Sequence, residues 1–423
     1  MTELLTNWAG NVRFGSRQVR RPTSVPGLQR LVAASPRVRA LGTGHSFSPI
    51  ADTPGALISV ADLPKIIEID LGRPSVTVSA GLTYGELAPA LHERGYALRN
   101  LGSLPHISVA GACATATHGS GNLIGNLATA VNRIEMVTAD GDLVTLSRED
   151  SGSEFSGAVV ALGSLGVLTS LGLDVVPTFD LKQYVYEDVP LDQAIASLDA
   201  LFASAYSVSL FTDWRRPAIR QVWLKKLAGE PDQPGAEPSW PAGRAADGPR
   251  HPVPGLPPEA TTAQLGARGP WHERLPHFRL GFKPSAGREL QSEYLLPREL
   301  AGAALAAIAQ ISDAVAAVLQ ICELRTVAAD DLWLSPSYRR DTAALHFTWV
   351  DDPPAVLGVL ALVERQLAPF RPRPHWGKLF AIGPEVLDRC YDRLPDFREL
   401  MDRYDPPGKF RNDFIETSLG VRR

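Results

Sequence analysis

The stretch from Asn100 to Asn132 constrains this chain most, because thirty-three consecutive residues include no Asp, Glu, Lys or Arg. Gly, Ser, Thr, Asn and His are scattered through it, which makes it too polar for a membrane-spanning helix. Ordered patterns flank it on both sides, which argues against a loose linker. Small residues let a ligand approach the backbone closely, and hydroxyls and amides donate hydrogen bonds. We therefore expect this stretch to be buried against a large polar ligand such as a cofactor.

A Gly-rich loop provides a second ligand-binding pattern. Residues 38–41 are predicted to form a strand, and Gly42-Thr43-Gly44-His45-Ser46 follows it. Two glycines permit a tight turn whose N–H groups can face phosphate oxygens. The dinucleotide pattern G-x-G-x-x-G is incomplete, because Phe47 stands where the third glycine belongs. Judged from the loop alone, His45 is better explained as a structural histidine than as a functional one.

The first 178 residues alternate short strands, helices and turns, which is typical of an α+β domain. Thr83 and Glu86 have the spacing of a capping box, which predicts a helix that starts after Thr83 and stops at Gly95. An Asp140-Gly141 pair predicts a turn after a strand. The apolar patterns predict strands at 38–41, 56–60, 66–70, 75–79, 134–138 and 167–175.

The sequence changes in character near residue 180, where we expect a second domain to begin. Residues 229–258 hold nine prolines and five glycines, which neither a helix nor a central strand tolerates. Because strand-like sequence resumes afterwards, we interpret them as an excursion inside this domain. The remaining patterns predict strands at 210–214, 220–224, 345–350 and 379–382, and helices at 300–319 and 355–367. We expect domains at 1–178 and 179–423.

Composition excludes several classes of protein. Lys and Arg number 42 against 46 Asp and Glu, a net charge of −4, so the chain lacks the basic excess of a nucleic-acid-binding protein. Its three cysteines lie far apart in the sequence, which argues against a disulfide framework and favours a reducing compartment. Residues 1–10 lack the apolar run of a signal peptide. We expect a cytoplasmic monomer that binds neither nucleic acid nor a membrane.

One segment, Trp271–His277, looks at first like a zinc motif. The motif H-E-x-x-H places its histidines four residues apart, whereas His272 and His277 are five apart. Pro276 would also break the helix that the motif requires. We therefore expect no metal.

Several segments together carry a resemblance to a known family. Those of the first 178 residues are VTVSAGLTYGELAPALHERGYAL, SLPHISVAGACATATHGSG, LGSLGVLTSLGLDVVP and the strand that leads into GTGHSF. They resemble the PCMH-type FAD-binding domain of the vanillyl-alcohol oxidase superfamily. The second half is similar to the alditol oxidase family, in the sugar-1,4-lactone oxidase group, on the segments YSVSLFTDWR, ELQSEYLLPRE, CELRTVAADDLWLSP, AALHFTWV, RPHWGKLF and DPPGKFRNDF.

The resemblance implies a two-domain α+β flavoprotein with covalently bound FAD, because the family's flavin-linked histidine falls on His45. The second domain is then a substrate-binding cap with a mixed sheet and flanking helices, and its C-terminal segment returns toward the flavin. Further contacts with FAD are implied for Gly42, Thr43, Gly44, Ser46, Ser103, Ser108, Gly111, Thr115, His118, Gly119, Gly166 and Val167.

The resemblance also implies a polyol-binding site at Ser103, Glu323, Arg325, His346, Thr348 and Lys378. Glu323 and Arg325 are two residues apart, as are His346 and Thr348, so each pair shares one face if its segment is a strand. Glu323 would accept hydrogen bonds from hydroxyls, while Arg325 and Lys378 would donate and stabilise negative charge. His346 is the candidate base.

The implied activity is oxidation of the terminal primary alcohol of an alditol such as xylitol or sorbitol, with O2 as acceptor and H2O2 as product. A sugar-1,4-lactone oxidase, a dehydrogenase that does not use O2, and a flavin-holding protein without turnover are the alternatives. The complete set of site residues argues against the last. Without the resemblance, Glu323 and Arg325 are more simply a structural ion pair and His346 a buried strand residue. Alkoxide formation driven mainly by Arg325 and Lys378 is also open.

Overall fold

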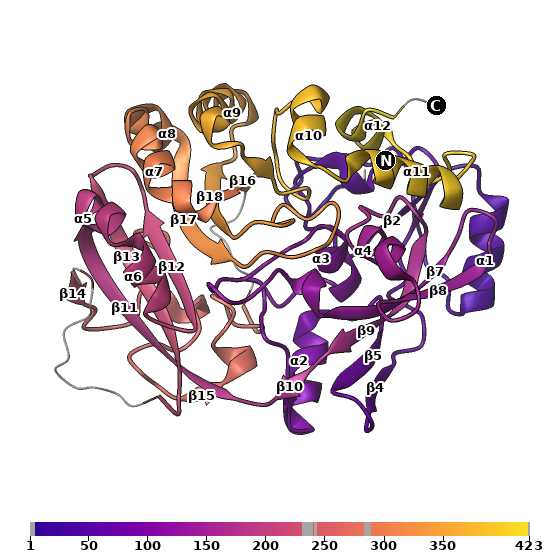
Figure 1. Cartoon of the computed structure of the whole chain (residues 1–423), viewed down its shortest axis with the longest axis horizontal. Helices are drawn as coiled ribbons and strands as arrows, with labels where there is room; N and C mark the ends of the chain where they lie inside the picture. The colour runs from indigo at the N-terminus through magenta and orange to yellow at the C-terminus, as the bar shows by residue number, and fades with distance from the viewer. Residues whose placement is uncertain (1–4, 231–239, 241–242, 283–288, 422–423) are drawn as a thin grey trace.

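The computed structural model describes residues 5–230, 240, 243–282 and 289–421. It is an α+β protein in which the N-terminal part of the chain lies beside a large sheet formed by the second half (Figure 1). The C-terminal helices return across the N-terminal part, so the first and last segments of the chain share one region of the molecule (Figure 1).

Antiparallel strands form the main sheet of the N-terminal part, in the order β4-β5-β9-β7-β8. These strands are β4 (Ile67–Asp70), β5 (Ser75–Ser79), β9 (Val167–Asp174), β7 (Val131–Val137) and β8 (Leu143–Ser147). A small parallel sheet contains β1 (Val19–Arg20), β3 (Ala56–Ile58) and β2 (Val38–Ala40), and β6 (Tyr96–Ala97) pairs with β10 (Val176–Pro177). The strands predicted in this part of the chain are confirmed, with ends that differ by a few residues.

The helices of this part are α1 (Val25–Ala34), α2 (Tyr84–Glu93), α3 (Val109–Ala114) and α4 (Gly152–Val159). The predicted capping box at the start of α2 is confirmed. Thr83 Oγ1 accepts from the Glu86 amide at 3.2 Å, and the Glu86 carboxylate accepts from the Thr83 amide at 2.9 Å. Gly95 follows α2 with a φ of +82°, a conformation that glycine adopts without strain.

The large sheet has the strand order β14-β11-β13-β12-β17-β18-β16-β19, with β15 paired to β11. Its long strands are β11 (Asp180–Pro190), β12 (Ser207–Thr212), β13 (Ala218–Leu227), β16 (Glu289–Pro297), β17 (Leu319–Val327) and β18 (Thr342–Val350). Its short strands are β14 (Arg244–Ala245), β15 (Gly269–Pro270) and β19 (Arg373–Pro374). Every described strand pairing in this sheet is antiparallel. The prediction of a mixed sheet, which came from the resemblance, is therefore wrong.

The two faces of the large sheet have opposite character because side chains alternate along each strand. Leu324 on β17 and Phe347 on β18 belong to an apolar core with Leu305 and Leu360 from the covering helices. Those helices are α5 (Leu191–Ala196), α6 (Leu198–Ala203), α7 (Ala301–Ala309), α8 (Ser312–Val318) and α9 (Pro353–Leu367). The intervening residues face the other way, and Glu323, Arg325, His346 and Thr348 among them are polar.

Two predicted elements differ in the structure. The single helix expected at 300–319 is wrong, because α7 and α8 meet at a bend of 82° and Leu319 already belongs to β17. Residues 379–382 do not form the predicted strand, since the Ala381 amide donates to the Glu364 carboxylate instead of to a neighbouring strand. Within the described ranges, no single helix is long and apolar enough to span a membrane, although the bent pair meets that length and hydropathy jointly.

The C-terminal segment contains α10 (Pro384–Cys390), α11 (Leu394–Tyr404) and α12 (Asp413–Leu419). Phe397 and Leu400 of α11 share an apolar cluster with Phe155 of α4. Tyr404 donates to Glu154 at 2.6 Å. These contacts therefore anchor the C-terminal helices to the N-terminal part. They also restrict the position of the preceding segment, which carries Lys378.

Candidate active site

A long cavity runs between the N-terminal part and the polar face of the large sheet. With its open mouth included, it encloses about 2430 Å³ free of protein atoms. At one end it is lined by the Gly-rich loop that follows β2, and at the other by residues of β16, β17 and β18. The two patterns that the sequence analysis singled out therefore face one space.

The loop of residues 42–46 offers its backbone to this cavity. Among the residues that the structure describes, none accepts a hydrogen bond from the N–H groups of these five residues. Gly44 has a φ of +73°, so the loop curves and its donors can converge on an anion such as a pyrophosphate. A Cβ built on Gly42 would come within 2.3 Å of Ser108 Oγ, and one on Gly111 within 2.7 Å. This close packing of glycine backbone fits the FAD that the resemblance implies.

The structure brings nearly all of the predicted FAD contacts to this cavity. Gly119 is the exception, since a Cβ there would meet Asn100 and Leu101 and the residue does not line the cavity. The predicted contacts that do line it are Gly42, Thr43, Gly44, His45, Ser46, Ser103, Ser108, Gly111, Thr115, His118, Gly166 and Val167.

His45 lies where the Gly-rich loop lines the cavity, beside the ring of Trp8. The ring centroids of Trp8 and His45 are 5.1 Å apart. Burial, with a smaller contribution from His106, lowers the pKa of His45 to about 4. The imidazole is therefore neutral near pH 7 and keeps a lone pair on one ring nitrogen, as a nucleophile requires.

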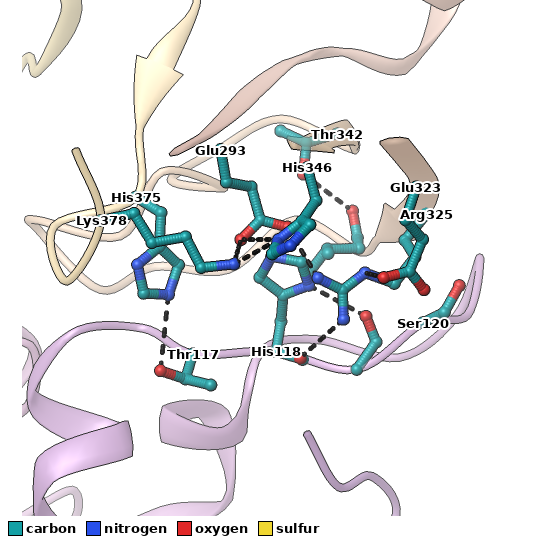
Figure 2. Close-up of polar contacts among 12 residues, drawn as sticks. Thr117, His118, Ser120, Glu293, Glu323, Arg325, Thr342, His346, His375 and Lys378 are labelled. Atoms are coloured by element: carbon teal, nitrogen blue, oxygen red, sulfur yellow. Dashed lines mark hydrogen bonds and ion pairs between the residues drawn. The ribbon is translucent and has the colours of Figure 1, made fainter. Parts of the chain in front are cut away.

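At the other end of the cavity, strand register brings the polar side chains together. Glu293 of β16 and Glu323 of β17 both pair directly with His346 of β18, one on each side. Arg325 lies two residues beyond Glu323 on the same face, and Thr348 two beyond His346. Lys378 reaches the group from the segment after β19, as Figure 2 shows. The residues that the sequence spacing placed on shared strand faces thus form one cluster in the structure.

Glu293 lies at the centre of this cluster and is 1% exposed. Its Oε1 accepts from Arg325 Nη2 at 2.7 Å, and its Oε2 accepts from Lys378 Nζ at 2.7 Å. His118 Nε2 lies 3.3 Å from the same carboxylate. Although burial raises the pKa of Glu293, Lys378, His118 and Arg325 together hold it well below its usual value. The carboxylate is therefore ionised and links strands to the loop that carries Lys378.

Glu323 is the second buried carboxylate. It accepts from His277 Nε2 at 2.8 Å, and its Oε2 lies 3.5 Å from Arg325 Nε. Burial raises its pKa, but Arg325 and His277 outweigh burial and lower it. Arg325 Nη1 lies 3.4 Å from Ser103 Oγ. Ser103, predicted from one motif, and Glu323 and Arg325, predicted from another, are thus brought into one group.

Both ring nitrogens of His346 are engaged. Nδ1 contacts Lys378 Nζ, and Nε2 lies 3.0 Å from Thr348 Oγ1. Burial, reinforced by Lys378, lowers the pKa of His346 to about 4, so the ring is neutral. A charged lysine only donates, so while Lys378 is protonated Nδ1 must accept and the ring proton lies on Nε2. Burial also lowers the pKa of Lys378.

The sequence analysis missed Glu293, His277, Lys225 and His375. Glu293 stands in ELQSEYLLPRE, and its period of two with Glu289 and Gln291, all of which line the cavity, was an available signal. His277 lies in a loop whose sequence pattern gives no sign of a functional role. Only its hydrogen bond to Glu323 in the structure places it at the site. His375 lies 3.4 Å from Thr117, and burial, reinforced by Lys378, lowers its pKa well below the usual value.

Comparisons with known proteins agree with this architecture. A family model described as an FAD binding domain matches residues 16–147, and one described as D-arabinono-1,4-lactone oxidase matches residues 285–418. Cholesterol oxidase from B. sterolicum has the same fold, with a TM-score of 0.76, 15% identity, and coverage of 98% of this chain and 96% of that one.

Three curated relatives match along nearly the whole chain. The alditol oxidase of Streptomyces sp. is 49% identical over 99% of this chain and 100% of its own length. The L-gulono-1,4-lactone dehydrogenase of Mycobacterium tuberculosis is 29% identical over 99% and 100%. The L-gulonolactone oxidase of Mus musculus is 27% identical over 97% of each chain.

Fold, cavity and matches together define an FAD-dependent oxidoreductase. Within that class, the chain belongs to the alditol oxidase family. The fold class and the family that the sequence indicated are thereby confirmed.

Proposed function

We propose that this protein oxidises the terminal primary alcohol of an alditol to the aldehyde and passes the electrons to O2. The observation that carries the proposal is the cluster of two buried carboxylates and two buried cations around His346, on the wall of the cavity that the FAD loop also lines. Membership of the alditol oxidase family supports the substrate class.

FAD held by the Gly-rich loop would supply an acceptor for the hydride of the alcohol carbon and, with the protons released, the electrons that reduce O2 to H2O2. The substrate loses that hydride from carbon and a proton from its hydroxyl, which leaves the aldehyde. We propose that this FAD is bonded covalently to His45, whose neutral imidazole is suited to attack on the flavin. The expectation of a cytoplasmic monomer with domains at 1–178 and 179–423 stays a prediction.

The residues of this chain orient the polyol by matching its hydroxyls. Glu323 accepts from a hydroxyl, while Arg325 and Ser103 donate to others. Arg325 also places positive charge where the alkoxide develops, and burial strengthens that attraction. The helix-covered face of the sheet excludes water from one side of the site.

His346 is the proposed base, but only in one protonation state of its pair with Lys378. While Lys378 is charged, His346 Nε2 holds the ring proton and cannot take another from the substrate. Once Lys378 is neutral, its nitrogen can accept from Nδ1–H, and Nε2 has a free lone pair. The pair thus accepts the substrate proton as a unit.

The first prediction tests the substrate class. A monoalcohol would leave buried groups of the site without hydrogen-bond partners, at roughly 1–3 kcal/mol each. For two such losses, kcat/KM for 1-propanol should be roughly 30- to 10⁴-fold below that for xylitol. Peroxide formation in air and reduction of a dye without air measure it. Similar kcat/KM values for the two alcohols would refute the polyol assignment, and dye reduction without peroxide would identify a dehydrogenase.

A second prediction concerns the flavin bond. Acid-precipitated protein should stay yellow, and the His45→Ala variant should release its flavin into the supernatant. His106→Ala is the matched control, because His106 lies near His45 but is not the proposed attachment site, and it should retain the flavin. Quantitative release from the unaltered protein would show that FAD is held without a covalent bond.

The third prediction concerns pH. Because the competent base requires neutral Lys378, the rate constant of anaerobic flavin reduction should rise with pH and level off above the lowered pKa of Lys378. In Lys378→Met the rise should move to lower pH, because it then follows the titration of His346 instead of that of Lys378. Stopped-flow absorbance from about pH 4 to pH 10 follows both. A profile that is flat, or unchanged in Lys378→Met, would place the base elsewhere.

A further inference from the structure

A buried chain of polar side chains lies behind Glu323, on the side away from Lys378. Lys225 of β13 contacts the Leu275 carbonyl, and its Nζ lies 3.3 Å from the Pro276 carbonyl and 3.2 Å from His277 Nδ1. His277 Nε2 lies 2.8 Å from Glu323 Oε1. Lys225 is 1% exposed and His277 is 5% exposed. None of the chemistry proposed above uses either residue.

The direction of each hydrogen bond in this chain follows from its carboxylate end. Ionised Glu323 only accepts, so the ring proton of neutral His277 lies on Nε2 and is donated to Glu323. His277 Nδ1 then has a lone pair that accepts from Lys225. Burial lowers the pKa of Lys225 to about 7, but the tautomer of His277 does not depend on the charge of the lysine because the carboxylate sets it. Burial lowers the pKa of His277 to about 4, which keeps the ring neutral.

The ring of His277 is also held in place sterically. Phe211 and Trp223 contact it edge to face, with centroid distances of 5.6 and 5.3 Å. Its carbonyl accepts from the Thr262 amide at 2.9 Å. The donor that meets Glu323 is therefore fixed in position before any substrate arrives.

The hydrogen bond from His277 determines which oxygen of Glu323 is available to a ligand. Oε1 is bound by His277, while Oε2 lies 3.5 Å from Arg325 Nε. Arg325 Nε makes no hydrogen bond with the residues that the structure describes. Without His277, the carboxylate could turn onto this vacant donor and form a closed pair with Arg325. With His277, Oε2 stays available for a hydroxyl.

We propose that Lys225 and His277 are positioning residues that keep the Glu323 carboxylate from closing onto Arg325, and that they thereby set the selectivity of the site for polyols. This rests on the proposed function above, since it concerns how the site recognises hydroxyls. Lys225 holds the ring of His277 in place through Nδ1, and His277 holds the carboxylate. Neither residue is assigned contact with the substrate.

Variants at His277 test the proposal. His277→Leu removes the donor, while the amide of His277→Gln can still reach Glu323 from the place of Nε2. In His277→Leu we expect the ratio of kcat/KM for xylitol to that for 1-propanol to fall roughly 5- to 100-fold, mainly through KM for xylitol, as expected for one lost hydrogen bond. His277→Gln should keep most of the ratio, and Lys225→Met should lie between them. His272→Leu, five residues away and outside the cavity, is the matched control.

Two outcomes would overturn the proposal: an unchanged ratio in His277→Leu, or an equal loss in His277→Gln. The flavin absorbance spectrum and thermal unfolding temperature of each variant show whether it has folded. Crystal structures of the unaltered protein and of His277→Leu separate this inference from the proposed function. If the unaltered protein does not oxidise xylitol, the proposed function fails. The inference then stands only if the Glu323 carboxylate has moved onto Arg325 in His277→Leu.

Discussion

The site depends on one buried carboxylate, that of Glu293. An unpaired charge in such an environment would cost several kcal/mol, and Glu293 avoids that cost by accepting from Arg325 and Lys378. Without it, Lys378 would lose its ion-pair partner and Arg325 would keep only Glu323, at 3.5 Å. The carboxylate therefore fixes the orientation of Arg325 on a neighbouring part of the sheet and ties the Lys378 loop to β16. Because Lys378 in turn contacts His346, the position and proton state of the proposed base follow from the same interaction.

The fold makes this buried charge cluster possible by separating the two faces of one sheet. Apolar residues of β17 and β18 pack against helices, and the intervening polar residues face the cavity. The Gly-rich loop after β2 approaches the same cavity from the N-terminal part, with its amides free of partners among the described residues. Gly42 and Gly111 pack so closely on Ser108 that a side chain at either position would not fit. The loop proposed to hold FAD and the proposed hydroxyl-binding cluster thus line one space.

Local patterns in the sequence predicted the features whose causes are local. The capping box of Thr83 and Glu86 depends on four consecutive residues, and the shared face of Glu323 and Arg325 depends only on the period of a strand. The importance of Glu293 is different, because it arises from the register that places Glu293 and Glu323 on either side of His346. The bend between α7 and α8 and the loss of a strand at 379–382 also depend on tertiary contacts. The resemblance supplied the catalytic roles, whereas the hydrogen bonds that orient His346 and Glu323 required the structure.

The most direct test of this account is the rate constant of anaerobic flavin reduction by xylitol in Glu293→Gln. This isosteric change keeps the shape of residue 293 but removes the charge that compensates Arg325 and Lys378. The account predicts a protein that retains its flavin and reduces it at least roughly 100-fold more slowly, the loss typical of a disturbed catalytic acid–base group. A rate constant within about twofold of the unaltered protein would show that the site does not depend on Glu293, and would contradict the account.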